Sequence, residues 1–308
     1  MKLLTALLSM QLPAISKFIA SSSKLLLPKN PVNMDNLRKF ANSYTDTSSM
    51  HPSHLVVDVF DNTKGLLKYR IYKNSLNQTP TDIVIWIHGG GYIVGSVYND
   101  DKITTLLQNK INTTVISLNY ALAPENPFPE GLHNIVENIR EISKLYPNSN
   151  LHIAGESAGA NLCLASKYYN PDIHYKTISL VYPPIIPSSA PLRSKVKFKN
   201  LNGLLTNKSL KYIYQNYINT TSLPLKTLKP LFPMYYIDMF NNSKILLLVA
   251  THDILYDENI MFYNKAQSKN IPIELKVYPD IHGFFGRFGH GIDALDYLSN
   301  FILSHSKF

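Results

Sequence analysis

Short apolar runs recur along the chain, and each is bounded by polar, glycine or proline residues, which is the pattern of strands. The run at 272–278 alternates apolar and polar side chains, whereas the runs at 82–88 and 244–250 are apolar almost throughout. Continuous runs predict strands that are buried on both faces of a sheet. Strands are predicted at residues 54–60, 65–72, 82–88, 113–119, 151–155, 176–182, 244–250 and 272–278.

Segments with apolar residues at helical spacing lie between most of these runs. Helices are predicted at residues 99–110, 131–145, 158–168, 257–269 and 291–304. After two opening strands, strands and helices therefore alternate. This order favours an α/β fold with a mostly parallel central sheet of about eight strands and helices on both faces.

One predicted strand-to-helix junction carries a reactive group. The motif Gly-Glu-Ser-Ala-Gly at residues 155–159 follows a predicted strand and opens a predicted helix. A strand that turns abruptly into a helix strains the central serine, and glycines two residues away remove side chains that would collide. The helix N-terminus favours negative charge that develops beside the serine. The motif therefore predicts that Ser157 is a nucleophile.

A second motif offers hydrogen-bond donors. The segment His-Gly-Gly-Gly-Tyr at residues 88–92 also follows a predicted strand. Three consecutive glycines allow a close backbone approach to another group, although an ordinary tight turn is the simpler alternative. Backbone N–H groups in such a loop can hold the oxyanion that forms when a serine attacks an ester. The two motifs together predict ester hydrolysis by an activated serine.

A serine needs a base, and the base needs a carboxylate that orients it. An acid and then a histidine follow the ends of two later strands. This is the chain order, serine then acid then histidine, of hydrolases whose serine lies on a sharp strand-to-helix turn. Asp253 follows the strand at 244–250, and His282 follows the strand at 272–278. Open α/β sheets place their sites beyond the carboxyl ends of the strands. Ser157, Asp253 and His282 are therefore the predicted triad.

Four other residues compete for these roles. His252 and His290 are alternative bases, and Asp257 and Asp280 are alternative acids. Asp257 lies in the predicted first turn of a helix, where the helix dipole alone favours an acid. His282 follows the last predicted strand, and this position favours it as the base.

The glycine motif, the serine motif, Asp253 and His282 follow one another in this order. With them, the chain resembles the hormone-sensitive-lipase-like branch of the α/β-hydrolases, the bacterial esterase family IV, from about residue 55 to the C-terminus. Residues 119–129 are similar to the family's Tyr-Arg-Leu-Ala-Pro-Glu segment, and residues 253–258 to its Asp-Pro-Leu-x-Asp-Glu segment. The chain departs from the family at Ala121, where the arginine is expected, and at Ile254, where the proline is expected. Neither departure changes a triad residue.

The resemblance implies roles for residues around the triad and for the rest of the chain. It assigns the oxyanion hole to the N–H groups of Gly90, Gly91 and Ala158. It assigns the support of the catalytic loops to His88, Gly89 and Glu156. It also implies an α/β-hydrolase fold with a helical cap, and esters with short-to-medium acyl chains as substrates.

Aromatic residues beside the catalytic loops are candidates for an acyl pocket, namely Tyr92, Phe284 and Phe285. Aromatic residues at such places belong to the core just as often. The same triad would also serve an amidase or a deacetylase, and a ligand-binding receptor with a closing lid is the non-catalytic alternative. Some plant receptors of this fold have lost the catalytic histidine, whereas His282 is present here.

Composition bounds the other classes of function. The chain has 308 residues and is 45% hydrophobic, which is enough for a large core. Its single cysteine, Cys163, allows no intrachain disulfide, and no His/Cys cluster has metal-ligand spacing. The sequence contains neither a glycine-rich phosphate loop nor an apolar run long enough to span a membrane. We therefore expect no metal and no cofactor.

The sequence predicts a cap segment at residues 1–50 and a core at 51–308, with a cap insertion at about 183–240 that would lie over the serine as a lid. Residues 1–20 have two interpretations. Lys2 and the apolar run after it resemble a signal peptide, while apolar positions at helical spacing favour a cap helix. We expect the cap helix and a cytoplasmic protein, with secretion if this segment acts as a signal peptide.

Positive charge is concentrated in the predicted caps. The net charge is +9, yet residues 186–230 contain eight Lys or Arg and no Asp or Glu. No nucleic-acid motif accompanies this charge, so we expect a small ester or lipid as partner and no nucleic acid. The simple interpretation is a solvated lid. The alternative is peripheral contact with anionic membranes through a strand-like face bearing Lys195, Lys197 and Lys199. The oligomeric state stays open, with a homodimer as one option.

Overall fold

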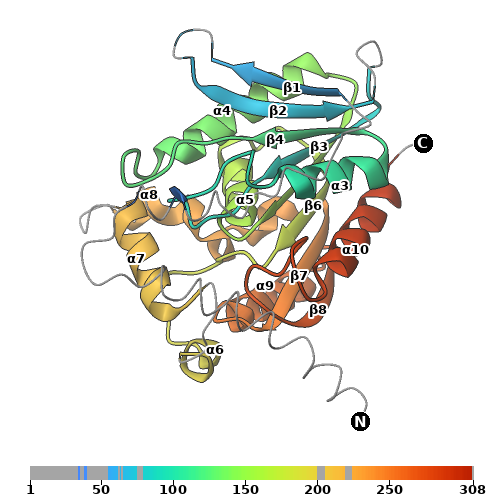
Figure 1. The fold of residues 1–308 in the computed structure, drawn as a ribbon. Helices are drawn as coiled ribbons and strands as arrows, with labels where there is room; N and C mark the ends of the chain where they lie inside the picture. Colours follow the sequence, from blue (N-terminus) through green and yellow to red (C-terminus); the bar gives the residue numbers. More distant parts are fainter. Residues whose placement is uncertain are drawn as a thin grey trace.

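The structure is a computed structural model, and it describes residues 34, 38–39, 55–61, 63, 65–74, 79–199, 205–218 and 224–306. An eight-stranded sheet runs through the centre of the described part, in the order β1-β2-β4-β3-β5-β6-β7-β8 (Figure 1). Its strands are β1 (Leu55–Phe60), β2 (Leu67–Lys73), β3 (Asp82–Ile87), β4 (Thr114–Leu118), β5 (Asn150–Glu156), β6 (Tyr175–Val181), β7 (Lys244–His252) and β8 (Ile273–Ile281).

The sheet is mixed at one edge only. β1 pairs with β2, and β2 with β4, in antiparallel register, whereas all the other neighbouring strands are parallel. The predicted fold class is therefore confirmed. Each predicted strand overlaps an observed one, and the ends differ by at most three residues. The largest difference is at the end of β8, which continues to the residue before His282.

Helices cover both faces of the sheet (Figure 1). One face packs against α4 (Glu130–Leu145), α5 (Ala158–Tyr169) and α9 (Tyr256–Ser268). The other packs against α3 (Asp101–Ile111) and α10 (Gly291–Leu303). These are the five helices predicted from the apolar spacing.

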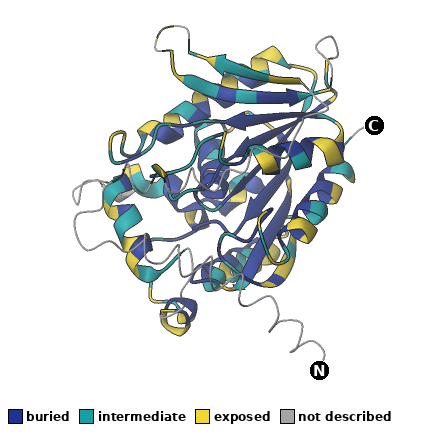
Figure 2. Ribbon diagram, viewed as in Figure 1, coloured by how far each residue is buried: buried dark blue, intermediate teal, exposed yellow. Residues whose placement is uncertain are grey.

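The central strands belong to two hydrophobic cores at once. Every residue of β3 is buried, which Figure 2 shows as a continuous dark strand. Ile83, Ile85 and Ile87 pack on the side of α4 and α5, while Val84 and Trp86 pack on the side of α3 and α10. Successive side chains of a strand point to opposite faces, so a continuous apolar run fits a strand with a core on each side.

The segment between β6 and β7 forms a cap of short helices. It contains α6 (Arg193–Lys197), α7 (Asn207–Ile218), α8 (Leu225–Leu228), η1 (Lys229–Leu231), η2 (Pro233–Tyr235) and η3 (Ile237–Phe240). α7 is amphipathic, with Leu210, Tyr214 and Tyr217 buried at helical spacing. These elements fall within the insertion predicted at about residues 183–240.

The predicted strand-like lysine face at 195–199 is wrong. Residues 193–197 form a helical turn, so side chains two positions apart no longer share one face. Lys195 is buried, and its ammonium donates to the carbonyls of Ser188 and Ala190 at 3.0 and 3.2 Å. Lys197 and Lys199 are exposed. The arrangement that motivated a membrane-docking face is therefore absent from this part of the cap.

Only three residues of the predicted N-terminal cap segment are described, and the alternatives for residues 1–20 lie outside the described residues. Arg38 nevertheless contacts the core. Its guanidinium donates to the carbonyls of Ile93 and Ala123 and forms a two-pronged ion pair with Glu125. Within the described residues, no helix has the length and apolar character needed to cross a membrane.

Candidate active site

The serine motif forms a sharp elbow between β5 and α5. Ser157 has φ +51° and ψ −121°, a region that residues with a side chain rarely adopt. Its N–H donates to the carbonyl of Val181 at 2.8 Å, and its own carbonyl accepts from the N–H of Asn161 at 3.1 Å. The hydrogen bonds to β6 and to the first turn of α5 hold this strained conformation in place.

The flanking glycines let α5 approach the end of β3. A Cβ atom on Gly159 would collide with the carbonyl of Ile87 and lie 2.5 Å from the carbonyl oxygen of His88. A Cβ atom on Gly155 would lie 2.8 Å from the same Ile87 oxygen. A side chain at either glycine would therefore collide with the backbone that leads into the glycine loop, as the sequence motif predicts.

Three residues predicted from distant segments meet at the elbow. Ser157 Oγ lies 2.9 Å from His282 Nε2, and His282 Nδ1 lies 2.6 Å from Asp253 Oδ2. The second oxygen of Asp253 accepts the N–H of Leu255 at 2.9 Å, so both carboxylate oxygens are held. Asp253 is 2% exposed and His282 is 8% exposed. The line from hydroxyl to imidazole to carboxylate has the geometry of proton transfer in a serine hydrolase.

The rival residues have other partners. His252 is exposed and its Nδ1 lies 2.9 Å from Thr251 Oγ1. His290 pairs with Asp280 at 3.2 Å, and Asp257 accepts the backbone N–H of Ser194 at 2.7 Å. No described hydrogen bond joins any of these four to Ser157, so the structure separates them from the serine.

The glycine loop adopts a backbone conformation that requires glycine. Gly90 has φ +114° and Gly91 has φ +60°, and a Cβ atom on Gly90 would collide with the carbonyl of Val94. Within the described part of the chain, nothing accepts a hydrogen bond from the N–H groups of Gly90, Gly91 or Ala158. Ala158 is the first residue of α5, whose opening N–H groups have no partner inside the helix. Three backbone donors are thus available.

His88 fixes the start of that loop. Its ring stacks on Tyr120 with centroids 4.2 Å apart, and its Nδ1 donates to the carbonyl of Gly89 at 2.7 Å. The Tyr120 hydroxyl donates to the carbonyl of His88 at 3.2 Å. Burial lowers the pKa of His88 to about 4, so the ring is neutral at pH 7. These contacts give His88 a positioning role in the loop, and its Nε2 is buried without a hydrogen-bond partner among the described residues.

A family model described as the alpha/beta hydrolase fold matches residues 84–286. The chain belongs to the α/β-hydrolase fold family. The matched region contains the elbow, the glycine loop and all three residues of the predicted triad. The predicted resemblance to the hormone-sensitive-lipase-like branch is confirmed.

Curated relatives and a solved structure agree with this membership. An α/β-hydrolase of Acanthamoeba polyphaga mimivirus is 26% identical over 300 residues, which cover 88% of this chain and 80% of that protein. An arylesterase of Saccharolobus solfataricus is 26% identical over 230 residues, 71% of this chain and 73% of that one. A hyperthermophilic esterase of Pyrobaculum calidifontis superimposes with a TM-score of 0.82 at 22% identity, covering 95% of this chain and 97% of that one.

In this α/β-hydrolase, the elbow is also supported by an ion cluster that sequence reasoning missed. Arg287 forms a two-pronged pair with Glu156, with both N–O distances 2.7 Å, and also donates to Asp100 at 2.8 Å. Glu156 further accepts from the Tyr182 hydroxyl, and Asp100 from the Trp86 indole N–H. Arg287 carries no motif signal, because its partners lie 131 and 187 residues away along the chain.

The two carboxylates of this cluster are more buried than their shared cation. Asp100 and Glu156 have side chains 2% and 7% exposed, while the Arg287 side chain is 32% exposed. Burial, and next the neighbouring Glu156 carboxylate, raise the pKa of Asp100 above its usual range. Arg287 opposes this shift, because its positive charge favours the ionised carboxylate. The guanidinium therefore compensates two buried acids directly behind the nucleophile.

The predicted acyl pocket is not supported at two of its three residues. Phe284 and Phe285 are fully buried in the core on the α3 and α10 side, where Phe285 stacks on Trp86 at 5.7 Å. The loop after His282 turns its aromatic rings into the core, so neither ring can face a substrate. Tyr92 is 2% exposed, stacks on Tyr217 at 3.9 Å and donates to Asn161 at 3.0 Å.

A cap residue that the sequence did not single out lies over the glycine loop. A Cβ atom on Gly91 would lie 2.7 Å from Ile213 Cδ1, so this side chain of α7 packs directly on the loop. The cap is also joined to the core by a hydrogen bond of 2.7 Å from the Phe128 N–H to the Tyr217 carbonyl. The cap therefore contacts the core at the glycine loop through α7.

Metal chemistry has no candidate ligand set in the part of the chain that the structure describes. There, no group of three or more His, Cys, Asp or Glu side chains has the geometry to hold a metal ion. The free Cys163 is buried in α5, where burial raises the pKa of its thiol well above the usual value.

Proposed function

We propose that this protein hydrolyses carboxylic esters by two-step acyl transfer through Ser157. The observation that carries the proposal is the continuous contact from Ser157 Oγ to His282 Nε2 at 2.9 Å and from His282 Nδ1 to Asp253 at 2.6 Å. A serine hydroxyl is a weak nucleophile alone, and an adjacent imidazole held in one orientation is what activates it. The names of the esterase relatives point in the same direction.

Each residue has a defined task in this reaction. His282 Nε2 takes the proton of Ser157 as Oγ attacks the ester carbonyl, and Asp253 holds the Nδ1–H and stabilises the imidazolium. The N–H groups of Gly90, Gly91 and Ala158 stabilise the oxyanion. His282 then protonates the leaving alcohol, and an acyl-serine remains. Water activated by the same imidazole attacks the acyl-serine, releases the carboxylic acid and restores Ser157.

A fluorophosphonate probe tests this assignment directly. We expect one equivalent of the probe to label the native protein at Ser157, because only an activated serine attacks phosphorus at a useful rate. Labelling should vanish in Ser157→Ala and should persist in Ser166→Ala, a buried serine of the same helix. Intact-protein and peptide mass spectrometry measure both results. Absence of labelling in the native protein would refute the proposal.

Short-to-medium acyl esters are the substrates we propose. The family resemblance implies this preference, and Ile213 of α7, which packs on Gly91, is a cap residue placed at the proposed oxyanion loop. A series of p-nitrophenyl esters of increasing chain length, run beside the matching anilides, measures this preference. We expect kcat/KM to be highest for short or medium chains and far lower for every anilide. Comparable turnover of anilides would indicate an amidase instead.

The elbow glycine provides a prediction that involves no catalytic side chain. In Gly159→Ala the new methyl group pushes the end of β3 away from α5, which displaces the glycine-loop donors from the serine. A misplacement of about 1 Å typically reduces turnover about 10²-fold. Steady-state kinetics with p-nitrophenyl butyrate measures the change. Gly65→Ala is the control for backbone strain away from the site: Gly65 has φ +65°, which alanine adopts less readily, but nothing lies within 4 Å of its Cβ position, so activity should be unchanged even where stability falls.

Three other expectations from the sequence stay predictions. They are a cytoplasmic location, assembly as a homodimer and the absence of nucleic-acid binding. Peripheral membrane contact also stays a prediction, but without the strand-like face that motivated it, because Lys195 and Lys197 lie on a short helix, Lys199 follows that helix, and Lys195 is buried.

A further inference from the structure

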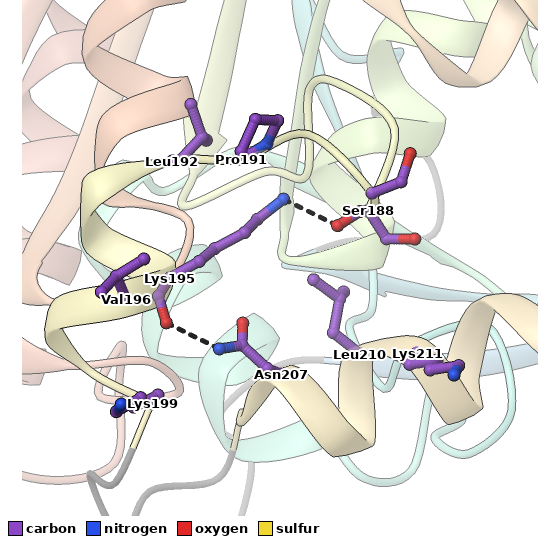
Figure 3. Close-up of a pocket in the computed structure, with 10 residues that line it drawn as sticks. Ser188, Pro191, Leu192, Lys195, Val196, Lys199, Asn207, Leu210 and Lys211 are labelled. Carbon is purple, nitrogen blue, oxygen red and sulfur yellow. Dashed lines mark hydrogen bonds between the residues drawn. The ribbon is translucent and has the colours of Figure 1, made fainter.

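The cap contains a cavity of about 580 Å³ between α6, α7 and the loop that follows β6 (Figure 3). This volume is in the range of small-molecule binding sites. The lining residues that matter here are Leu192, Lys195, Val196, Lys199, Leu210 and Lys211. No lining residue belongs to the proposed triad or oxyanion hole, so the proposed reaction does not explain the cavity.

One part of the cavity wall is apolar. Leu210 is buried and points from α7 into the space below Pro191 and Leu192, as Figure 3 shows. Val196 of α6 also lines the cavity and is 66% exposed, which is unusual for a β-branched apolar side chain. A ligand with an aliphatic portion would cover this surface and remove it from water.

The rim of the cavity is positively charged. Lys199 and Lys211 line it and are exposed, and neither forms an ion pair with any described residue. No lining residue is acidic. Residues 186–230, which include all the lining residues, also contain no Asp or Glu. The one acid of the cap insertion, Asp238, pairs with Lys269 at 2.7 Å, so residues 186–230 leave the two ammonium groups without a carboxylate of their own.

The ammonium of Lys195, the third lysine that lines the cavity, already has protein partners and is not free to bind a ligand. The ammonium of Lys195 donates to two backbone carbonyls, those of Ser188 and Ala190, and lies 3.7 Å from the buried Glu258 carboxylate. An ammonium has three donors, so these partners occupy it. The Asn207 amide donates to the Lys195 carbonyl at 2.6 Å and ties α7 to α6. Figure 3 shows the hydrogen bond from Lys195 to Ser188 and the one from Asn207 to Lys195.

One helix, α7, contributes both to the cavity and to the contact between the cap and the glycine loop. Leu210 lines the cavity, and Ile213 packs on Gly91 of the glycine loop. Residues three apart lie on the same side of a helix, with a rise of about 4.5 Å between them. The same helix therefore lines the cavity and packs on the loop that carries two of the proposed oxyanion donors.

We propose that this cap cavity is a binding site for a medium-chain carboxylate, with the alkyl chain on Leu210, Leu192 and Val196 and the carboxylate at the lysine rim that Lys199 and Lys211 provide. The apolar wall selects the chain, and the acid-free lysine rim selects the anion. The choice of a carboxylate rests on the proposed function, because ester hydrolysis releases this class of anion. The ligand site itself is independent of the triad.

Octanoate binding to the Ser157→Ala protein tests the site without any turnover. We expect calorimetry to show saturable binding of octanoate and much weaker binding of octanol, which has the chain without the charge. The double variant Lys199→Glu/Lys211→Glu should weaken octanoate binding at least tenfold, because attraction becomes repulsion at both ends of the rim. Lys208→Glu/Lys226→Glu makes the same change of net charge at exposed cap lysines that do not line the cavity, and it should bind octanoate normally.

A photoreactive diazirine derivative of octanoate locates the bound chain. Crosslinking to residues 188–199 or 205–211, lost in Lys199→Glu/Lys211→Glu, supports the proposal. Crosslinking only around Ser157, equal affinity for octanol, or an equal loss of binding in both double variants would overturn it. The failure of the proposed function would appear separately, as the absence of fluorophosphonate labelling in the native protein.

Discussion

Ser157→Ala and His282→Ala should each lower kcat by about 10⁴-fold or more, and Asp253→Asn should lower it somewhat less. The hydroxyl and the imidazole are the bond-forming groups, whereas Asp253 acts through the imidazole that it orients at 2.6 Å. Because the serine and the histidine act as one unit, the double variant Ser157→Ala/His282→Ala should be no slower than either single variant. Steady-state and single-turnover kinetics with p-nitrophenyl butyrate measure these differences.

The neighbouring histidines serve as matched controls. His252 and His290 lie close to the triad residues in sequence, but their ring contacts are to Thr251 and Asp280. His252→Ala and His290→Ala should therefore retain kcat within a few-fold of the native value. An equal loss of activity in either control, or fully additive losses in the double variant, would contradict the assignment of His282.

Arg287→Met should lower the free energy of unfolding by about 3 kcal/mol, the lower end of the range for breaking a buried ion pair. The lower end applies because the Arg287 side chain is itself 32% exposed, whereas Asp100 and Glu156 are almost fully buried. The variant leaves both carboxylates in the interior without a cation. Urea unfolding followed by far-UV circular dichroism measures the loss.

The loss in Arg287→Met should also depend on pH. A buried carboxylate without a cation has a folded pKa above its unfolded value, so the folded state binds more protons and stability falls as pH rises. The deficit should therefore be larger at pH 8 than at pH 5. Arg140→Met is the matched control, since this arginine makes an exposed hydrogen bond to the Tyr169 carbonyl, and it should be nearly neutral at both pH values. A deficit that is independent of pH would rule out this account.

The features that sequence reasoning predicted well have local causes. The apolar runs of β3 and β7 predict buried strands because each residue finds a core on one side of the sheet or the other. The serine motif predicts the elbow because its glycines are required by backbone that lies within a few ångströms. Chain order after successive strands then identified Asp253 and His282, since parallel strands bring their carboxyl ends to one edge.

The features that sequence reasoning missed depend on distant contacts. Arg287 and Ile213 are ordinary residues in sequence, and only the fold brings them to Glu156 and to Gly91. The two phenylalanines after His282 were misplaced because position beside a catalytic loop does not determine which way a ring turns. The lysines at 195–199 were misread because alternation over five residues does not distinguish a strand from one helical turn.

The place of β5 in the sheet has a consequence for how the protein fluctuates. This strand is paired on both sides, by β3 and by β6, while β1 and β8 are the edges of the described sheet. Fraying begins at edges and at termini, where few hydrogen bonds must open together. Backbone amides of β1 and β8 can therefore exchange with solvent while Ser157 keeps its strained backbone conformation. Heat inactivation then reports the cooperative melting of the whole domain.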